Sequence, residues 1–334
     1  MLNRRQILLA PLLLAACGDR GAPRTRPLFA ADTHPDEYPT VQALHAIDRL
    51  LDKRTNGEMR VRVYAGGQMG AEKDTLEITV FGGLDLNRVN LAPLNSIVPE
   101  TIVLALPFMF RSIAHARAVF DGSPGRQILD AMLPHGLYGL AYYDSGARSF
   151  YNTKRPIVTP DDMRGLKIRV QNSDIYVAMV QALGANPTPI PYGEVYQALI
   201  QGVVDGAENN WPSYESSRHY EAARHYSLTR HVLAPEVLVA SQRSWDRMSS
   251  EEQGYLQAAA SDSVPIMRKM WDARVEASAA RVLEDGIQLV EELDHAAFAD
   301  RMLSVWDRFL TTPQLRTLAD DIVNLAGEEM AKDE

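Results

Sequence analysis

The chain has 334 residues, of which 46% are hydrophobic and 23% are charged, and its formal net charge is −9. This length allows two lobes of ordinary domain size, and the composition is that of a soluble globular protein. The acidic balance argues against a nucleic-acid-binding protein, whose contact surface is basic, and it requires any anion site to be a local, buried cluster of arginines.

The first 27 residues are predicted to be an export signal and a tether. Arg4 and Arg5 precede an apolar run at 7–16, which is typical of a secretory signal peptide and too short for a transmembrane helix. Cys17, the only cysteine, follows in a sequence similar to a bacterial lipoprotein box. We expect removal of residues 1–16, a lipidated tether at 17–27, and a periplasmic protein anchored to the membrane by that lipid. The alternative is that Cys17 is a small apolar residue of an ordinary signal peptide, and Sec and twin-arginine export both stay open.

From residue 28 to residue 153 the hydrophobic pattern predicts alternating strands and helices. Strands are indicated at 28–33, 59–64, 84–91 and 137–153, and helices at 39–55, 72–81, 113–120 and 125–133. The last strand is long, and Gly146 lies near its middle. A strand of this length can cross between two lobes, so we place a first hinge at residues 144–148.

The stretch from Gly165 to Tyr214 reads as strand, helix, strand, helix, strand. Arg169 lies on the first strand, Tyr192 just before the second helix, and Asn209 at the end of the last strand. In open α/β sheets, ligands bind at the carboxyl ends of the strands. We therefore expect this stretch to form one wall of a small-molecule cleft, with Arg169 as its anion anchor.

The rest of the chain supplies a return crossing and long helices. Residues 226–241 form a second long strand pattern, and residues 244–285 have apolar residues at helical spacing, with Pro265 expected to start or kink the helix. A helix of about 20 residues spans about 30 Å, which is enough to lie across both lobes. Further helix is expected at 296–329.

These elements predict an α/β fold in which two crossings join two lobes, a clamshell with its ligand in between. Lobe I is expected to comprise residues 28–146 and 237–275. Lobe II is expected to comprise residues 147–236 and 276–334, with the C-terminal helices packing across both lobes.

The sequence contains no motif that indicates a catalytic residue, a metal site or a cofactor site. The Gly-rich turn at 66–70 lacks the GxGxxG spacing of nucleotide-binding loops, and there is no HExxH, no GxSxG and no pair of cysteines. A protein that binds without turnover, with neither cofactor nor metal, is therefore predicted.

Six stretches resemble, in order and spacing, the solute-binding proteins of TRAP (tripartite ATP-independent periplasmic) transporters, the DctP-type family. They are GGQMGAEKDTLE, GGLDLNRVN, ALPFMF, GLKIRV, GANPTPIPYGEVYQALIQGVVDGAEN and LAPEVLVAS. The resemblance implies a type II-like periplasmic-binding-protein fold with a long helix spanning both lobes. It also implies closure on an organic acid, which is delivered to large and small membrane subunits driven by a sodium gradient.

The resemblance assigns roles to particular residues. The family arginine of the GLKIRV strand, which forms a salt bridge with the ligand carboxylate, corresponds to Arg169, and a second arginine after the first hinge corresponds to Arg148. The other wall positions correspond to His34, Glu72, Asn90, Tyr192 and Asn209.

Two stretches, THPDEYPT and AENNWPSYESSRH, resemble the subgroup that binds hexuronates such as D-glucuronate and D-galacturonate. Tyr192 or Trp211 would then stack on the apolar face of the pyranose ring. The two arginines converge, while the remaining candidates are mostly neutral amide and hydroxyl groups. This combination favours one carboxylate plus several hydroxyl groups over a dicarboxylate.

Each residue also has a structural alternative. Arg169 could pair with Asp162, Arg148 could pair across the lobes, and Trp211 could be a core residue. The asparagines could serve turns, Glu72 could stabilise a helix start, and His34 could bond to the backbone of a turn.

Other functions stay open as well. They are a receptor for keto-gulonate, another sugar acid or a C4-dicarboxylate, a secreted uronate-processing enzyme such as a lyase or isomerase, and a receptor that presents its liganded form to a sensor.

Overall fold

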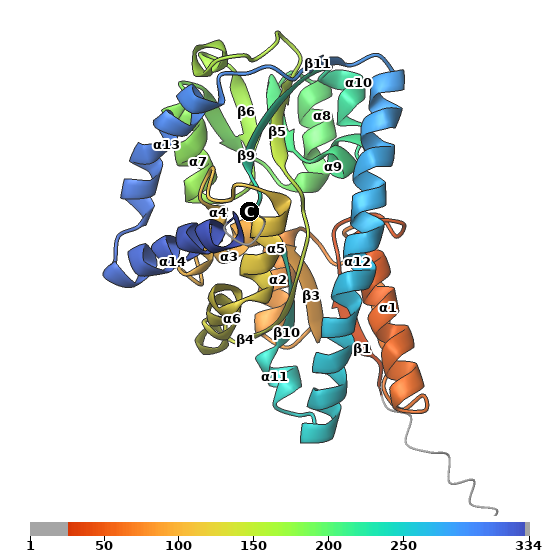
Figure 1. The fold of residues 1–334 in the computed structure, drawn as a ribbon. Helices are drawn as coiled ribbons and strands as arrows, with labels where there is room; N and C mark the ends of the chain where they lie inside the picture. The colour runs from red at the N-terminus through yellow and green to blue at the C-terminus, as the bar shows by residue number, and fades with distance from the viewer. Residues whose placement is uncertain (1–25, 331–334) are drawn as a thin grey trace, which may run out of the picture.

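The computed structural model describes residues 26–330 and contains two β-sheets, each flanked by helices (Figure 1). Sheet A has the strand order β2-β1-β3-β10-β4 and defines lobe I; sheet B has the order β11-β9-β5-β8-β6-β7 and defines lobe II. The strands of sheet A are β1 (Leu28–Ala31), β2 (Val61–Tyr64), β3 (Leu86–Asn90), β4 (Leu137–Tyr143) and β10 (Glu236–Ser241). The strands of sheet B are β5 (Arg148–Asn152), β6 (Lys167–Val170), β7 (Asn186–Pro189), β8 (Gly206–Asn209), β9 (His225–Val232) and β11 (Gln288–Val290). The predicted signal peptide and Cys17 lie outside the described residues.

The two predicted long strands are each two strands that belong to different sheets. The first runs as β4 in sheet A and β5 in sheet B, and the second as β9 in sheet B and β10 in sheet A. The first connection, residues 144–147, contains Gly146 at φ +61°, where an added Cβ would lie 3.2 Å from the Trp271 ring. Two strand crossings, β4–β5 and β9–β10, therefore join the sheets, and α12 (Ser250–Glu284) makes a further connection from sheet A to β11 of sheet B. The first strand crossing breaks at residues 144–147, where the hinge was placed from the sequence.

Helices flank both sheets, and those predicted at 39–55, 72–81, 113–120 and 125–133 are present with small shifts at their ends. In lobe I they are α1 (Pro39–Arg54), α2 (Glu72–Val80), α3 (Leu91–Leu94), α4 (Thr101–Ala105), α5 (Ile113–Asp121), α6 (Ser123–Asp130) and α11 (Gln242–Trp245), with the 3-10 turn η1 (Leu133–His135). In lobe II they are α7 (Asp174–Ala182), α8 (Val195–Ile200), α9 (Trp211–Ser216) and α10 (His219–Ala222), with η2 (Pro160–Met163) and η3 (Tyr192–Glu194).

Helix α12 (Ser250–Glu284) runs along one side of the molecule past both sheets (Figure 1). Its 35 residues extend over about 50 Å at the rise of an α-helix. It packs on α1 and β4 of lobe I and on α9 of lobe II. The helix begins with a capping box between Ser249 and Glu252, and Pro265 lies inside it and does not start it. The predicted helix spanning both lobes is confirmed.

The C-terminal helices α13 (His295–Phe309) and α14 (Pro313–Met330) pack on different lobes. Helix α13 lies on α7, and α14 lies on α5, where Nε2 of His115 is 2.9 Å from the carbonyl oxygen of Ile322. The exact lobe boundaries stay a prediction, and Glu236, assigned to lobe II from the sequence, is the first residue of β10 in sheet A. Within residues 26–330, no helix combines the length and the hydrophobicity needed to cross a membrane.

Candidate functional site

A narrow polar cavity of about 20 Å³ lies between the lobes. Its lobe I wall consists of Thr33, His34, Glu72, Asn90 and Glu236, and its lobe II wall of Arg148, Arg169, Gln171, Tyr192, Asn209 and Ser213. Seven of the eight side chains predicted from the sequence therefore meet here: His34, Glu72, Asn90, Arg148, Arg169, Tyr192 and Asn209.

Strand ends from both sheets form this cavity. Asn90 is the last residue of β3 and Asn209 the last of β8, while Arg169 lies on β6 one residue before its end. His34 follows the end of β1. Because β1 and β3 are parallel, as are β6 and β8, their carboxyl ends meet at one edge of each sheet. The two edges face each other across the cavity.

Arg148, at the start of β5, is fully buried and held by lobe II. Its Nε donates to Oε2 of Glu208 (2.5 Å), its Nη2 to Oε1 of Glu208 (2.8 Å), and its Nη1 to Oδ1 of Asn209 (2.9 Å). Burial alone would raise the pKa of Glu208, but the charge of Arg148, with hydrogen bonds from His231 and Arg148, lowers that pKa to about 2. The ion pair joins β5 to β8 within lobe II and does not cross between the lobes.

Arg169 is also buried, with 3% of its surface exposed, but it has no carboxylate partner among the described residues. Its Nε donates to the carbonyl oxygen of Ile190 (2.8 Å). Asp162, the alternative partner, instead accepts hydrogen bonds from the backbone of Val158 and Thr159 (3.0 and 2.8 Å). Burial lowers the pKa of Arg169, because the charged guanidinium has lost its water. A buried cation without a counterion favours the binding of an anion beside it.

The positive charge of Arg169 also acts on a buried histidine. Burial first, and the charge of Arg169 second, lower the pKa of His219 to about 3, so this imidazole is neutral at neutral pH. Its Nδ1 lies 2.8 Å from the hydroxyl of Tyr151. His219 therefore adds no positive charge beside Arg169 at neutral pH.

Aromatic rings close the cavity between the lobes. The ring of His34 stacks on Tyr38 of lobe I, with centroids 3.9 Å apart, and lies 5.2 Å from the ring of Tyr192 in lobe II. The Tyr192 hydroxyl is 2.5 Å from Oγ of Ser217, and burial raises its pKa, so it is a neutral phenol. Tyr192 thus presents a ring and a hydroxyl group next to the arginines of the lobe II wall.

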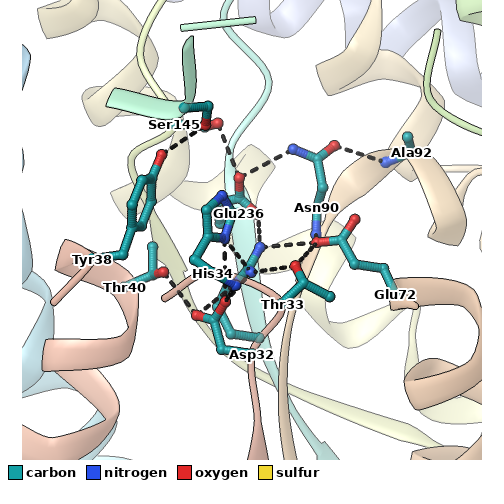
Figure 2. A network of polar contacts seen from close by, with 12 residues as sticks. Asp32, Thr33, His34, Tyr38, Thr40, Glu72, Asn90, Ala92, Ser145 and Glu236 are labelled. Carbon is teal, nitrogen blue, oxygen red and sulfur yellow. Dashed lines mark hydrogen bonds and ion pairs between the residues drawn. The ribbon is translucent and has the colours of Figure 1, made fainter. Parts of the chain in front are cut away.

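The lobe I wall is built around Arg88, a fully buried residue of β3. Its Nε donates to Oδ2 of Asp32 (2.8 Å), and its Nη1 donates to Glu72 (2.9 Å) and to Glu236 (2.5 Å). Its Nη2 donates to Asp32, and Nδ1 of His34 lies 2.6 Å from the same nitrogen. One arginine thus holds three carboxylates, and Figure 2 shows the side chains of Asp32, Glu72 and Glu236 converging. Asp32 directly follows β1, and the two glutamates begin α2 and β10.

The three carboxylates do not respond alike to this environment. Burial alone would raise the pKa of Asp32 and of Glu236, but the charge of Arg88 together with hydrogen bonds and other neighbouring charges outweighs it, and both pKa values lie below the ordinary range. The pKa of Glu72 is raised, first by burial, which outweighs Arg88, and further by the neighbouring charge of Glu236. Asp32 and Glu236 therefore stay ionised at neutral pH, and lobe I presents excess negative charge to the cavity.

Side chains of the two lobes hydrogen-bond directly across the cavity. With its amide oriented so that both ends are bonded, Gln171 donates to Oδ1 of Asn90 (2.6 Å) and accepts from Nη2 of Arg148 (3.1 Å). The hydroxyls of Tyr38 and Ser213 are 2.9 Å apart. The described arrangement is therefore one in which the lobes are in contact.

Trp211 does not line this cavity. Its ring stacks on Tyr226, with centroids 4.0 Å apart, and it faces a separate cavity of about 780 Å³ on the hinge side, which Trp271 also lines. This position agrees with the packing alternative for Trp211. The neighbouring Asn210 caps α9, and its Nδ2 donates to the carbonyl oxygen of Ser145 in the first crossing (2.7 Å).

Several residues of the cavity were not predicted as site residues: Thr33, Gln171, Ser213 and Glu236 line it, and Asp32 and Arg88 lie behind it. Gln171 had a usable signal, because it stands two residues after Arg169 and strand residues two apart share a face. Glu236 also had a usable signal, because it is the only charged residue in the apolar stretch LAPEVLVAS, and a charged residue in a buried strand is normally paired or functional.

The chain is similar to known proteins over most of its length. A family model described as bacterial extracellular solute-binding protein, family 7, matches residues 30–312. A solute-binding protein from Chromohalobacter salexigens is 42% identical over 290 residues, which cover 86% of this chain and 86% of that protein.

Two solved structures extend this similarity to the backbone. A TRAP periplasmic solute-binding protein from Bradyrhizobium sp. BTAi1, in complex with α/β-D-galacturonate, is 52% identical with a TM-score of 0.88 and covers 90% of this chain and 100% of that chain. Another from Chromohalobacter salexigens, with bound D-glucuronate, is 40% identical with a TM-score of 0.87 and covers 89% and 99% of the two chains. The expected α/β fold of two lobes is confirmed.

The Arg148–Glu208 pair predicts a specific acid sensitivity. The pKa of Glu208 is lowered from 4.5 to about 2, so its ionised form stabilises the fold fully above pH 4.5, and this contribution is lost as the pH falls toward 2. Glu208→Gln leaves Arg148 without its counterion, and we expect a loss of about 3 kcal/mol in the free energy of unfolding at pH 7.

Urea unfolding at a series of pH values checks this expectation. Between pH 4.5 and pH 3 the free energy of unfolding should fall less steeply in Glu208→Gln than in the wild type. Glu215→Gln, which removes a partly exposed partner of Arg274, serves as the control and should change little. Parallel pH profiles of Glu208→Gln and wild type would contradict the assignment.

Proposed function

The chain belongs to family 7 of the bacterial extracellular solute-binding proteins and is the periplasmic solute receptor of a TRAP transporter, and we propose that its solute is a hexuronate such as D-glucuronate or D-galacturonate. In this proposal the receptor closes on the sugar acid and delivers it to the membrane subunits. The similar proteins from Bradyrhizobium and Chromohalobacter were solved with these two acids bound, which supports a hexuronate for this chain as well.

The observation that carries the proposal is the buried, uncompensated Arg169. Its Nε is bonded to the Ile190 carbonyl, and no described carboxylate pairs with its two Nη groups. A guanidinium binds a carboxylate through two parallel hydrogen bonds and stays charged when desolvated. We infer that the uronate carboxylate binds Arg169. Arg148 adds a second positive charge to the same wall, although Glu208 already neutralises it.

The remaining wall residues suit the hydroxyl groups of a sugar. Asn90 and Asn209 have amide groups, which donate and accept, while Oε1 of Glu72 accepts from Arg88 and from the Asn90 backbone. The Tyr192 ring offers a surface for the apolar face of a pyranose. Charge-assisted hydrogen bonds contribute about 1.5–3 kcal/mol each, and micromolar binding needs about 8 kcal/mol net. This set is therefore sufficient after the ordering cost of closure.

Ligand entry requires the lobes to separate. A cavity of about 20 Å³ holds little more than one water molecule, so a sugar acid does not fit between the walls in the described arrangement. The bonds that span the cavity, such as Gln171 to Asn90, are between side chains and can be exchanged for bonds to a ligand. The two sheets are joined by the strand connections at 144–147 and 233–235. We expect the lobes to rotate about these two connections.

We propose binding without turnover. The cavity contains His34, Glu72 and Glu236, which all contact Arg88. Burial raises the pKa of Glu72, whereas the pKa of Glu236 is lowered despite burial, chiefly by the charge of Arg88. A base held in an ion pair with a buried arginine is a weak one. Incubation of the purified protein with D-galacturonate and D-glucuronate should leave both acids unchanged by ¹H NMR, while either one raises the melting temperature. A new product signal would establish an enzyme instead.

Arg169→Ala tests the carboxylate anchor. We expect at least a 100-fold loss of affinity for the uronate in calorimetry, because two charge-assisted hydrogen bonds disappear. The melting temperature without ligand should stay the same or rise, since an unpaired buried charge is removed. Lys167→Ala removes a positive charge from the exposed end of the same strand and should bind normally. Affinity of Arg169→Ala close to that of the wild type would exclude the anchor role.

The lipid anchor at Cys17 is a second part of the proposed function and lies outside the described residues. Its support is the position of the only cysteine directly after the apolar run of the signal. Cys17→Ser should move the mature protein from the membrane fraction to the soluble periplasmic fraction of cells that express it. A variant that stays with the membrane would show that Cys17 is not the anchor.

A further inference from the structure

The two walls of the cavity carry opposite charge. In lobe II, Arg148 and Arg169 face one carboxylate, Glu208, which leaves an excess of one positive charge. In lobe I, Arg88 faces Asp32, Glu72 and Glu236, which leaves an excess of negative charge. A ligand that bridges the walls therefore meets an anion-binding side and an anion-repelling side.

Arg88 cannot turn toward a ligand anion, because its donors are already used. An arginine has five N–H groups. Here Nε donates to Asp32, Nη1 to Glu72 and Glu236, and Nη2 to Asp32 and to Oγ1 of Thr33 (3.1 Å). The one arginine of the lobe I network is thus saturated. A second carboxylate on the ligand would find negative charge there and no free donor from Arg88.

Glu236 is the carboxylate of this wall that is tied to both the cavity and the hinge. It begins β10 directly after the second crossing, and its Oε1 accepts from Oγ of Ser145 in the first crossing (3.0 Å) and from Nδ2 of Asn90 (3.2 Å). Its Oε2 accepts from Nη1 of Arg88 (2.5 Å). A carboxylate has about four acceptor positions, so about one is left on Oε2 for a hydroxyl donor.

We propose that Glu236 is a specificity-determining residue of this receptor: it accepts a ligand hydroxyl group at the lobe I wall and rejects acids that carry a second carboxylate at that end. This inference rests on the proposed function, because it assumes that the first carboxylate binds Arg169. Glu236 suits the role better than Glu72, which is more exposed and whose raised pKa allows it to take up a proton and accept an acidic neighbour.

The sharpest test compares acids that differ only in the group at the end opposite the carboxylate that binds Arg169. D-Galactonate and galactarate are open chains of the same length and configuration, with one and two carboxylates, whereas D-galacturonate forms a hemiacetal ring and has one carboxylate. Calorimetry should show that the wild type binds galactonate at least about tenfold more tightly than galactarate, because like charges placed together at an interface are strongly unfavourable. In Glu236→Gln this ratio should fall toward one, mainly through a gain in galactarate affinity.

Glu236→Gln keeps the size of the side chain, and Arg88 keeps two carboxylate partners, so the lobe I network stays compensated. Glu215→Gln is the matched control: it removes one negative charge outside the cavity and should leave the ratio unchanged. An unchanged ratio in Glu236→Gln overturns the proposal. Equal binding of galactonate and galactarate by the wild type also overturns it, without any variant.

The outcomes separate this inference from the proposed function. If galacturonate binds and Arg169→Ala abolishes that binding, but the galactonate-to-galactarate ratio does not depend on residue 236, only the role of Glu236 fails. If galactarate and galactonate bind with the expected ratio while neither uronate binds, the hexuronate assignment fails and the charge selection by Glu236 stands.

Discussion

A buried charge is tolerated only where an opposite charge or a set of hydrogen bonds replaces water, and this constraint organises the whole cleft. Among residues 26–330, three arginines are buried, namely Arg88, Arg148 and Arg169. Arg88 holds three carboxylates in lobe I and Arg148 pairs with Glu208 in lobe II, whereas Arg169 is bonded to one backbone carbonyl. The two compensated arginines shape the walls, and the uncompensated one leaves a cost of burial that a bound carboxylate removes.

The architecture places these charges by delivering strand ends to a common gap. Parallel pairing puts the ends of β1 and β3 together in sheet A and those of β6 and β8 together in sheet B. The crossings β4–β5 and β9–β10 turn the two sheet edges toward each other, and α12 lies along both lobes (Figure 1). Glu236 and Ser145 join the two crossings by a hydrogen bond of 3.0 Å. The polar wall and the hinge are therefore one connected structure.

The sequence allowed the lobe II wall to be predicted better than the lobe I wall, for a physical reason. Arg169 and Asn209 stand at strand ends within one continuous stretch, so local pattern and the rule of strand ends suffice. The Arg88–Glu236 pair joins residues 148 positions apart, and nothing local in LNRVN shows that its arginine is buried or which acids surround it. The position of Trp211 was unpredictable for the same reason. Its ring stacks on Tyr226, a residue of another element, and lies outside the cavity.

The opposite charges of the walls have a consequence for closure as well as for selection. Walls of opposite sign attract each other across a cavity with low dielectric, and neutral side chains of the two lobes also bond directly across the gap of about 20 Å³, as Gln171 does to Asn90. A ligand has to replace that attraction to hold the lobes together. A molecule with one carboxylate and a hydroxyl-bearing opposite end does so, because it neutralises the side of Arg169 and donates to Glu236. A symmetric diacid would pair one carboxylate with Arg169 and place the other against the negative lobe I wall. The charge pattern that draws the lobes together therefore also selects a ligand with a carboxylate at one end and hydroxyl groups at the other.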